Sequence, residues 1–320
     1  MGAAAPIVND GGRALWRAAA VLASTPPKDQ RVGYAYSVSA ALCSAAYLFP
    51  YKSAARLASP DVLAYALLIV AALSSSALSL WQRGRASAPR LDRTFWATSA
   101  LLALLAISGN WCGAQAVARL DPAIASVLLR TEIVFVGAFG AFVLAERVTL
   151  GLLGGAALAL GGLAVMRWPL ALDRAGTGAL WALGGAASFG MMQVLTRRVI
   201  GRISPVAVNT CRLWIAVALW SLSPGVTRGA LTSGAEFWAL VTLAGLLGPF
   251  VGRLLIMYSL RWLEAAHSAL LLLLAPVFAF LIGYVGYGSV PSEAELLGGA
   301  IMLVGIAMPS LARAADERRR

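Results

Sequence analysis

Long apolar segments alternate with short polar ones along most of the chain. Segments such as 65–81 (YALLIVAALSSSALSLW) and 268–288 (SALLLLLAPVFAFLIGYVGYG) approach or reach the ~20 residues that a helix needs to cross a bilayer. The alternating segments of about ten residues that build a transmembrane barrel are absent from the sequence. The pattern therefore predicts ten transmembrane helices, near 33–50, 60–81, 94–117, 122–145, 148–168, 176–196, 204–223, 235–260, 265–287 and 294–312.

The composition supports an all-α polytopic membrane protein. Of the 320 residues, 60% are hydrophobic and 12% are charged, with a mean hydropathy of +0.78, whereas soluble domains have about a quarter of charged residues. The net charge of +12 could suggest nucleic-acid binding. The basic residues, however, lie in short runs between apolar segments, such as 82–93 and 196–202, which is typical of cytoplasmic loops. We therefore expect the lipid bilayer as a partner, and no nucleic acid.

The positions of the basic residues also predict the orientation. With both termini placed in the cytoplasm, 17 Lys and Arg residues fall on the cytoplasmic side, 6 on the opposite side and 3 within spans. Cytoplasmic loops carry such an excess of positive charge. The first thirty residues contain no uninterrupted apolar core of signal-peptide length. We therefore predict a multi-pass protein of the cell (cytoplasmic) membrane with both termini inside.

An internal repeat relates the two halves of the chain. VGYAYSVSAALCSAAYL (32–48) is similar to TGALWALGGAASFGMMQ (177–193), and ARLDPAIASVLL (118–129) is similar to RWLEAAHSALLL (261–272). Each half contains five predicted helices, so the second half must cross the membrane in the opposite sense. Many transporters are built as such inverted repeats. The predicted units are an N-terminal cytoplasmic arm (1–32), two five-helix repeats (33–168 and 176–312) and a basic cytoplasmic tail (313–320).

These segments resemble the EamA-type branch of the drug/metabolite transporter superfamily. The resemblance rests on LDPAIASVLL…FGAFVLAERVTLGLLGGAALALGGLAVM (120–166), on LEAAHSALLLLLAPVFAFL…LLGGAIMLVGIAM (263–308) and on ISPVAVNTCRLWIAVAL (203–219). It implies ten helices in two inverted five-helix repeats around a central cavity. The first, third, fourth, sixth, eighth and ninth helices would line that cavity, while the fifth and tenth would pack outside it or form a homodimer contact.

The sequence departs from the family pattern at two places. Similar proteins often keep a Glu after the fourth helix of each repeat. Glu146 occupies that place in the first half, but Gly288 and Ser289 occupy it in the second. The ninth helix carries Pro276, whereas the fourth has Arg-Thr-Glu at 130–132 instead. The two halves are therefore not equivalent.

Four charged residues lie deep within predicted spans: Arg130, Glu132, Arg212 and Arg253. Because a charge near the bilayer centre costs roughly 3 kcal/mol, such residues face a watery cavity or a charged partner. Arg130 and Glu132 are two positions apart, about 200° around a helix, so we expect them to point to different faces. Glu132 would then pair with Arg253 or Arg212. Arg212 lies near the cytoplasmic end of its span, where it could instead extend its charge to the surface.

Three arginines against one carboxylate favour an anionic substrate group, because a guanidinium binds carboxylate or phosphate through a fork of hydrogen bonds. Glu132 could also couple transport to protons. The alternative is a buried polar network that only fixes helix packing. The predicted substrate-binding residues are Arg130, Glu132, Arg253, Asn110 (which the repeat aligns with Arg253), Gln193 and Tyr36, and those predicted to be structural are Arg212 and Glu146.

These features predict a secondary transporter of a small polar or anionic metabolite, working as an exporter by alternating access. The chain has no P-loop motif that would bind ATP. Its single His267 and three scattered cysteines form no metal-ligand or nucleophile–base pattern, so we expect no enzyme, no metal and no cofactor. The alternatives are an exchanger of phosphorylated or nucleotide-linked sugars, and a non-transporting membrane scaffold.

Overall fold

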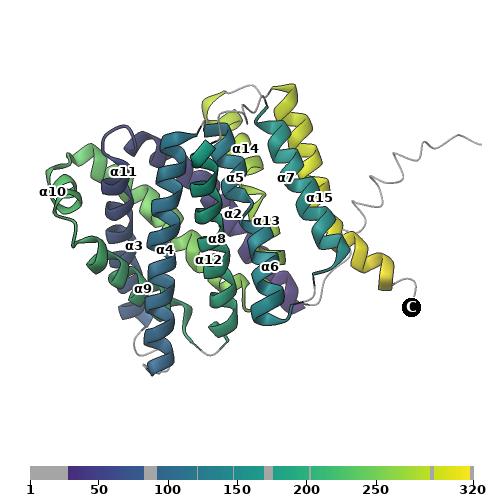
Figure 1. Ribbon diagram of the computed structural model, residues 1–320, viewed down its shortest axis with the longest axis horizontal. Helices are drawn as coiled ribbons and strands as arrows, with labels where there is room; N and C mark the ends of the chain where they lie inside the picture. Colours follow the sequence, from purple (N-terminus) through teal and green to yellow (C-terminus); the bar gives the residue numbers. More distant parts are fainter. Residues whose placement is uncertain are drawn as a thin grey trace, which may run out of the picture.

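The computed structural model describes residues 28–82, 92–120, 122–146, 148–168, 176–201, 203–288 and 292–317. These residues form helices joined by short turns, with no strand among them, and the helices pack side by side (Figure 1). The predicted arm (1–32) is described only from residue 28 onward. The predicted tail (313–320) is described only to residue 317, where the last helix ends.

The first half of the chain supplies α2 (Lys28–Ala54), α3 (Pro60–Gln82), α4 (Arg93–Arg119), α5 (Pro122–Arg130), α6 (Glu132–Leu144) and α7 (Leu150–Met166). The second half supplies α8 (Gly176–Val199), α9 (Pro205–Trp220), α10 (Pro224–Thr232), α11 (Ala235–Gly245), the π-helix η2 (Leu246–Gly252), α12 (Arg253–Ser259), α13 (Ala265–Leu272), α14 (Ala275–Tyr287) and α15 (Glu293–Glu317).

Local signals in the sequence explain several helix starts. Asp92 accepts a hydrogen bond from the backbone N–H of Phe95 at 2.8 Å, and Thr149 and Ser204 cap α7 and α9 in the same way. Such side chains satisfy backbone donors that the first turn of a helix leaves free. The sequence analysis missed α10. This helix begins at Pro224, and proline is favoured at the first helical position.

The structure supports a polytopic membrane protein. Within the described residues, seven helical segments are long and apolar enough to cross a membrane, and an eighth is obtained if α9 and α10, which are bent by 104°, count as one span. All ten predicted segments fall on helices, and α7 is a shorter apolar helix. Large apolar side chains cover the outside of the bundle, with Phe142 89% and Val285 83% exposed. A lipid environment explains such exposure, because soluble proteins keep exposed apolar patches small.

Three of the predicted spans are interrupted near their centres. The fourth is broken at Thr131, between α5 and α6, and the ninth at 273–274, between α13 and α14. The eighth contains η2 between α11 and α12. Under the alignment of 118–129 with 261–272, Thr131 corresponds to Leu274, so the two breaks occupy the same place in the repeat. The second break precedes Pro276, which cannot donate a backbone hydrogen bond, whereas the first occurs without proline, between Arg130 and Glu132.

The helices of the two halves pack against each other in matching pairs. α4 and α6 of the first half pack on α8, and the corresponding segments α11–α12 and α14 of the second half pack on α2. Extended contacts also join α3 with α9 and α7 with α15, which are corresponding helices of the two halves, and α4 with α9, whose counterpart in the repeat is the contact of α11 with α3. A two-fold axis between the halves explains this pattern. Such an axis converts a contact of α4 with α8 into one of α11–α12 with α2, and it leaves a contact between two corresponding helices unchanged.

Glycines allow α7 and α15 to approach each other closely. A Cβ atom at Gly162 would lie 2.5 Å from the carbonyl oxygen of Gly298, and a Cβ at Gly155 would lie 2.5 Å from that of Gly305. Small residues in these positions allow backbone-to-backbone packing, which is typical of helix pairs in membranes. Figure 1 shows the pair at one edge of the bundle, so it forms a supporting layer away from the centre.

Candidate functional site

A cavity of about 260 Å³ lies between the two halves of the bundle. Its walls come from α2, α3, α4 and α5 of the first half and from α8, α9, η2 and α12 of the second. The resemblance had implied a contribution from the ninth helix. Instead, α3 and α9 contribute, and α13 and α14 are absent from the wall. The lining residues are Ser44, Tyr47, Leu48, Ala64, Leu67, Leu68, Ala106, Asn110, Arg130, Phe189, Met192, Arg212, Gly248, Pro249, Gly252, Arg253 and Ile256.

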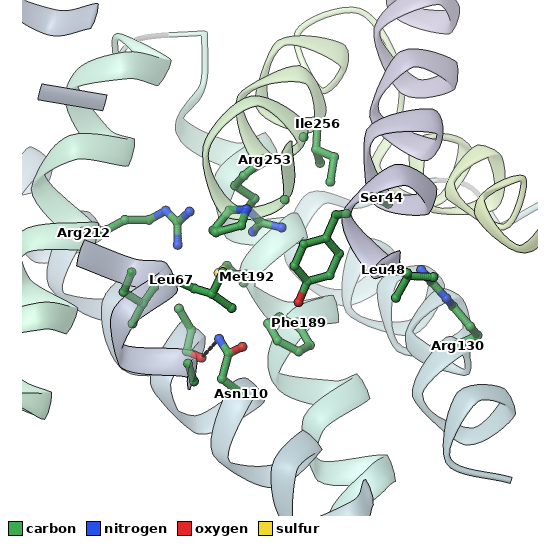
Figure 2. Close-up of a pocket in the computed structure, with 17 residues that line it drawn as sticks. Ser44, Leu48, Leu67, Asn110, Arg130, Phe189, Met192, Arg212, Arg253 and Ile256 are labelled. Atoms are coloured by element: carbon green, nitrogen blue, oxygen red, sulfur yellow. Dashed lines mark hydrogen bonds between the residues drawn. The ribbon is translucent and has the colours of Figure 1, made fainter. Parts of the chain in front are cut away.

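Three arginines line this cavity. Figure 2 shows Arg212 and Arg253 extending toward it from one side, while Arg130 lies on the other side beside Leu48. Arg130 and Arg253 were predicted substrate-binding residues, and so was Asn110, which also lines the cavity. Asn110 Nδ2 donates to the carbonyl oxygen of Ala106 at 2.7 Å. The Oδ1 atom of Asn110 accepts no hydrogen bond from the described residues.

The π-helix η2 shapes one wall. Its Pro249 lacks a backbone N–H, and π-helical segments often occur at functional sites. A Cβ at Gly248 would lie 2.7 Å from the ring of Tyr47, so the ring packs directly on the η2 backbone. Arg253 follows η2 as the first residue of α12. The change of helical geometry thus sets the direction in which Arg253 leaves the helix.

A polar network holds Arg212 in place. Its Nε and Nη2 atoms donate to Asn209 Oδ1 at 3.1 and 2.7 Å. Asn209 Nδ2 in turn donates to Ser75 Oγ at 3.3 Å, and that hydroxyl is 2.7 Å from Thr210 Oγ1. Arg212 is only 4% exposed, so the expectation that it extends to the membrane surface is wrong. A buried asparagine one turn away captures the guanidinium and directs it to the cavity.

Two predicted substrate-binding residues form a pair outside the cavity wall. Gln193 Nε2 donates to the Glu132 carboxylate, and Gln193 is 1% exposed. Among the described residues, Glu132 makes no ion pair within 4 Å, so the predicted direct pairing with Arg253 or Arg212 is not present. The charges that act on Glu132 come from Arg130 and Arg253 at longer range. The Glu132–Gln193 pair therefore joins α6 to α8 behind the cavity.

Tyr36, the remaining predicted substrate-binding residue, lies away from the cavity. Its ring stacks on that of Tyr258, with the centroids 5.6 Å apart, and the Arg261 guanidinium lies 5.4 Å from the Tyr258 ring. An aromatic residue that aligns with another across the repeat can serve packing as well as binding, and the sequence did not distinguish the two.

The sequence analysis did not include Ser44, Phe189 or Met192 in the site, and it offered Tyr47 only as one of several polar candidates within the spans. The repeat offered one signal, because it aligns Tyr47 with Met192 and both line the cavity. The apolar residues gave no signal of their own, because they are indistinguishable in sequence from those that face lipid.

A second polar cluster joins the halves where α6 and α8 end and α13 begins. We call Glu146, Arg197 and Ala265 the Glu146 cluster. The backbone N–H of Ala265 donates to Glu146 Oε2 at 3.2 Å, and Arg197 Nε lies 3.6 Å from Glu146 Oε1. Arg197 Nη1 also donates to the carbonyl oxygen of Leu260 at 2.6 Å. Glu146, predicted to be structural, thus connects the first half to two helices of the second.

Opposing effects act on the Glu146 carboxyl group. Burial raises its pKa, the hydrogen bond from Ala265 lowers it, nearby Glu264 raises it and Arg197 lowers it; the net pKa is raised. Glu264 also lies 2.8 Å from His267 Nδ1, measured from Oε2. His267 itself is 6% exposed within α13.

The repeat does not reproduce this cluster at the opposite end of the bundle. Ser289 replaces Glu146 and Lys52 replaces Arg197 under the repeat alignment, while Pro122, which lacks an N–H, replaces Ala265. The backbone turn is nevertheless preserved: Ala145 and Gly288 correspond, and both are left-handed, with φ of 53° and 63°. Glycine adopts this conformation without strain, whereas alanine does so at a cost. The first half therefore keeps the turn and places a carboxylate directly after it.

A helical membrane bundle with a polar cavity between two similar halves is an architecture of membrane transporters. This chain belongs to the EamA-like transporter family, whose model matches residues 31–168 and again residues 176–311.

Individual proteins are similar to parts of the chain. A probable terminal-alkyne amino-acid exporter of Streptantibioticus cattleyicolor is 30% identical over 183 residues, which are 57% of this chain and 62% of that protein. The match therefore spans less than two thirds of that relative. A crystal structure of a protein with 19% sequence identity has a TM-score of 0.74 and covers 90% of this chain and 100% of its own, which supports the fold.

Proposed function

We propose that this chain is a secondary transporter that exports a small polar or anionic metabolite by alternating access. The observation that carries the proposal is the cavity, which receives side chains from both halves of the chain. Family membership and the similarity to a probable exporter support transport and its direction. Because the sequence contains no P-loop motif, we propose that a gradient or an exchanged solute supplies the energy for transport.

The architecture that we propose has ten transmembrane helices in two inverted five-helix repeats. The two family matches, the matching helix pairs and the equivalent breaks at 131 and 273–274 support it. We further propose that the protein lies in the cytoplasmic membrane with both termini inside, as the distribution of Lys and Arg favours. In this orientation the Glu146 cluster lies at the cytoplasmic end, where it holds the two halves together.

Three arginines at one cavity also favour a second candidate, an exchanger of phosphorylated or nucleotide-linked sugars. Guanidinium groups bind phosphate by paired, charge-assisted hydrogen bonds. The cavity volume of about 260 Å³ argues against nucleotide-linked sugars, because pockets for drug-sized ligands measure about 300–1,000 Å³. A small sugar phosphate remains compatible with the site.

Filling the cavity tests the transport pathway. Ser44→Phe places a ring in the cavity wall, whereas Ser39→Phe places the same ring on an exposed position of the same helix. Proteoliposomes are loaded with glutarate, propionate, glutamate, alanine and glycerol 3-phosphate, and efflux is followed by mass spectrometry. We expect wild type and Ser39→Phe to release at least one compound, and Ser44→Phe to release it at least about tenfold more slowly because the ring occupies the cavity.

Two outcomes count against the proposal. Equal efflux from Ser44→Phe and wild type would place the pathway elsewhere. Release of none of the five compounds would argue against a transporter of small polar or anionic metabolites. Size-exclusion chromatography of each variant separates loss of transport from loss of fold.

A further inference from the structure

The cavity wall carries an uncompensated positive charge. The described residues that line it include Arg130, Arg212 and Arg253 but no Asp or Glu. The carboxylate whose charge interacts with two of these arginines is that of Glu132, which is held by Gln193 outside the wall. Counted together, three arginines and one glutamate leave two positive charges. Charge at this depth is costly unless a partner or water compensates it.

Several N–H donors of these arginines also make no hydrogen bond to the described residues. Arg253 Nε is buried without an acceptor, and the Arg253 guanidinium makes no hydrogen bond to the described residues. The same holds for the guanidinium of Arg130. Arg212 uses Nε and Nη2 on Asn209, which leaves Nη1 available. Each guanidinium has five N–H donors, so the cavity offers many donors and lacks charged acceptors.

These donors lie on two sides of the cavity. Arg212 and Arg253 occupy one side and Arg130 the other, beside Leu48 (Figure 2). Between them the wall is largely apolar, with Leu67, Phe189 and Met192. A ligand that satisfies both sides has an acidic group at each end of a short apolar body, or one group that itself carries two negative charges.

We propose that the substrate is a small dianion without an ammonium group, either a dicarboxylate or a phosphate monoester. This inference rests on the proposed transport function and names its substrate class. Two negative charges match the two positive charges that remain when the three arginines and Glu132 are counted together. Phosphate esters carry close to two negative charges at neutral pH. An ammonium group would find three arginines and no carboxylate on the wall. The rings of Tyr47 and Phe189 offer an ammonium group only a weak cation–π attraction.

The proposal distinguishes this chain from the relative named as a probable exporter of an amino acid, because amino acids carry an ammonium group. The similarity over 183 residues therefore extends to the fold and to transport, while the charges of this cavity select another ligand.

Binding of two matched ligands tests the substrate class. Glutarate and glutamate have the same two carboxylates and differ by one ammonium group. The full chain is placed in lipid nanodiscs in phosphate-free buffer, and dissociation constants are measured by calorimetry. We expect glutarate or glycerol 3-phosphate to bind at least about tenfold more tightly than glutamate or alanine, since one unpaired charge costs more than 1.4 kcal/mol in a buried site. The glutarate and glycerol 3-phosphate arms distinguish dicarboxylate from phosphate.

Two arginine variants test the two-sided arrangement. We expect Arg253→Gln to weaken binding of the preferred dianion by at least about tenfold, because it removes charge-assisted hydrogen bonds to the ligand. Arg130→Gln should weaken glutarate but leave propionate, which has one carboxylate, within about twofold. Arg228→Gln is the matched control, because Arg228 is exposed on α10 and is not among the residues that line the cavity.

The outcomes separate this inference from the proposed function. Equal or tighter binding of glutamate or alanine overturns the substrate class, and so does binding of neither dianion at millimolar concentration. If alanine is then released from proteoliposomes by wild type but not by Ser44→Phe, transport through the cavity stands and only the dianion inference is lost. Unchanged dianion binding in both arginine variants would also overturn it, provided each variant elutes as folded protein.

Discussion

We expect replacement of Gly162 by valine to lower the free energy of unfolding by about 3 kcal/mol or more, because it forces two backbones apart. An added Cβ would lie 2.5 Å from both the Gly298 carbonyl oxygen and the Met302 nitrogen. Neither atom can rotate away as a side chain would, so α7 must separate from α15. That separation removes the extended contact between these two helices. The midpoint of thermal unfolding in detergent measures the effect.

The neighbouring glycine is a matched control. A Cβ at Gly161 meets no atom within 4 Å, and Gly161 is exposed where Gly162 is buried. Gly161→Val changes the same helix by the same atoms, so any loss of helix propensity is shared between the two variants. We expect its midpoint to stay much nearer that of wild type. Equal midpoints for the two variants would show that close packing of α7 on α15 contributes little to stability.

The sequence predicted the class of the fold because that class depends on properties that accumulate along the chain. Apolar runs near the length of a bilayer crossing, and basic residues concentrated between them, indicate a polytopic helical protein whatever the details of packing. The repeat indicated which segments correspond. Length and hydropathy could not reveal the break at Thr131, because no proline marks it, whereas Pro276 marked its counterpart.

The site was only partly predictable for a related reason. Burial of a charge within a span indicated that Arg130 and Arg253 face the interior, and both line the cavity. Which neighbour satisfies a charge depends on side chains from distant segments. Gln193 is 61 positions from Glu132, and no spacing rule connects them. Arg212 was misjudged because its position along the span suggested access to the surface, while Asn209 one turn earlier holds it inside.

We expect Glu146→Ala to shift the protein toward a state that is open at the end formed by α6, α8 and α13. In the structure, Glu146 holds this end closed as the acceptor for the Ala265 N–H and the counter-ion of Arg197. Under alternating access these contacts must break when that end opens, and the described residues of the opposite end form no equivalent cluster. Alanine leaves the Ala265 N–H without its acceptor, and an unsatisfied buried donor costs roughly 1–3 kcal/mol, so we expect the equilibrium to change by about tenfold.

Hydrogen–deuterium exchange in nanodiscs measures this shift. Residues 33–40 and 263–270 should exchange faster together, because Ser37 Oγ lies 3.1 Å from Ser268 Oγ across the closed end. Exchange near Leu120 and Gly178, which pack together at the other end, should become slower. A purely local role for Glu146 predicts faster exchange at Ala265 alone. Glu293→Ala removes an exposed carboxylate at the start of α15 and should change neither region.

The raised pKa of Glu146 predicts how a lower pH and the substitution Glu146→Gln change the equilibrium between the closed and open states. When the end opens and water reaches the carboxyl group, its pKa returns to the ordinary value, so the closed state binds the proton more tightly. This stabilisation of the closed state is fully present below the ordinary pKa and is lost as the pH rises through the raised one. Glu146→Gln keeps an acceptor for Ala265 without the buried charge. At pH 7 we therefore expect exchange at the closed end to be fastest in Glu146→Ala, slower in wild type and slowest in Glu146→Gln. Slower exchange in wild type than in Glu146→Gln would show instead that the ionised carboxylate stabilises the closed state.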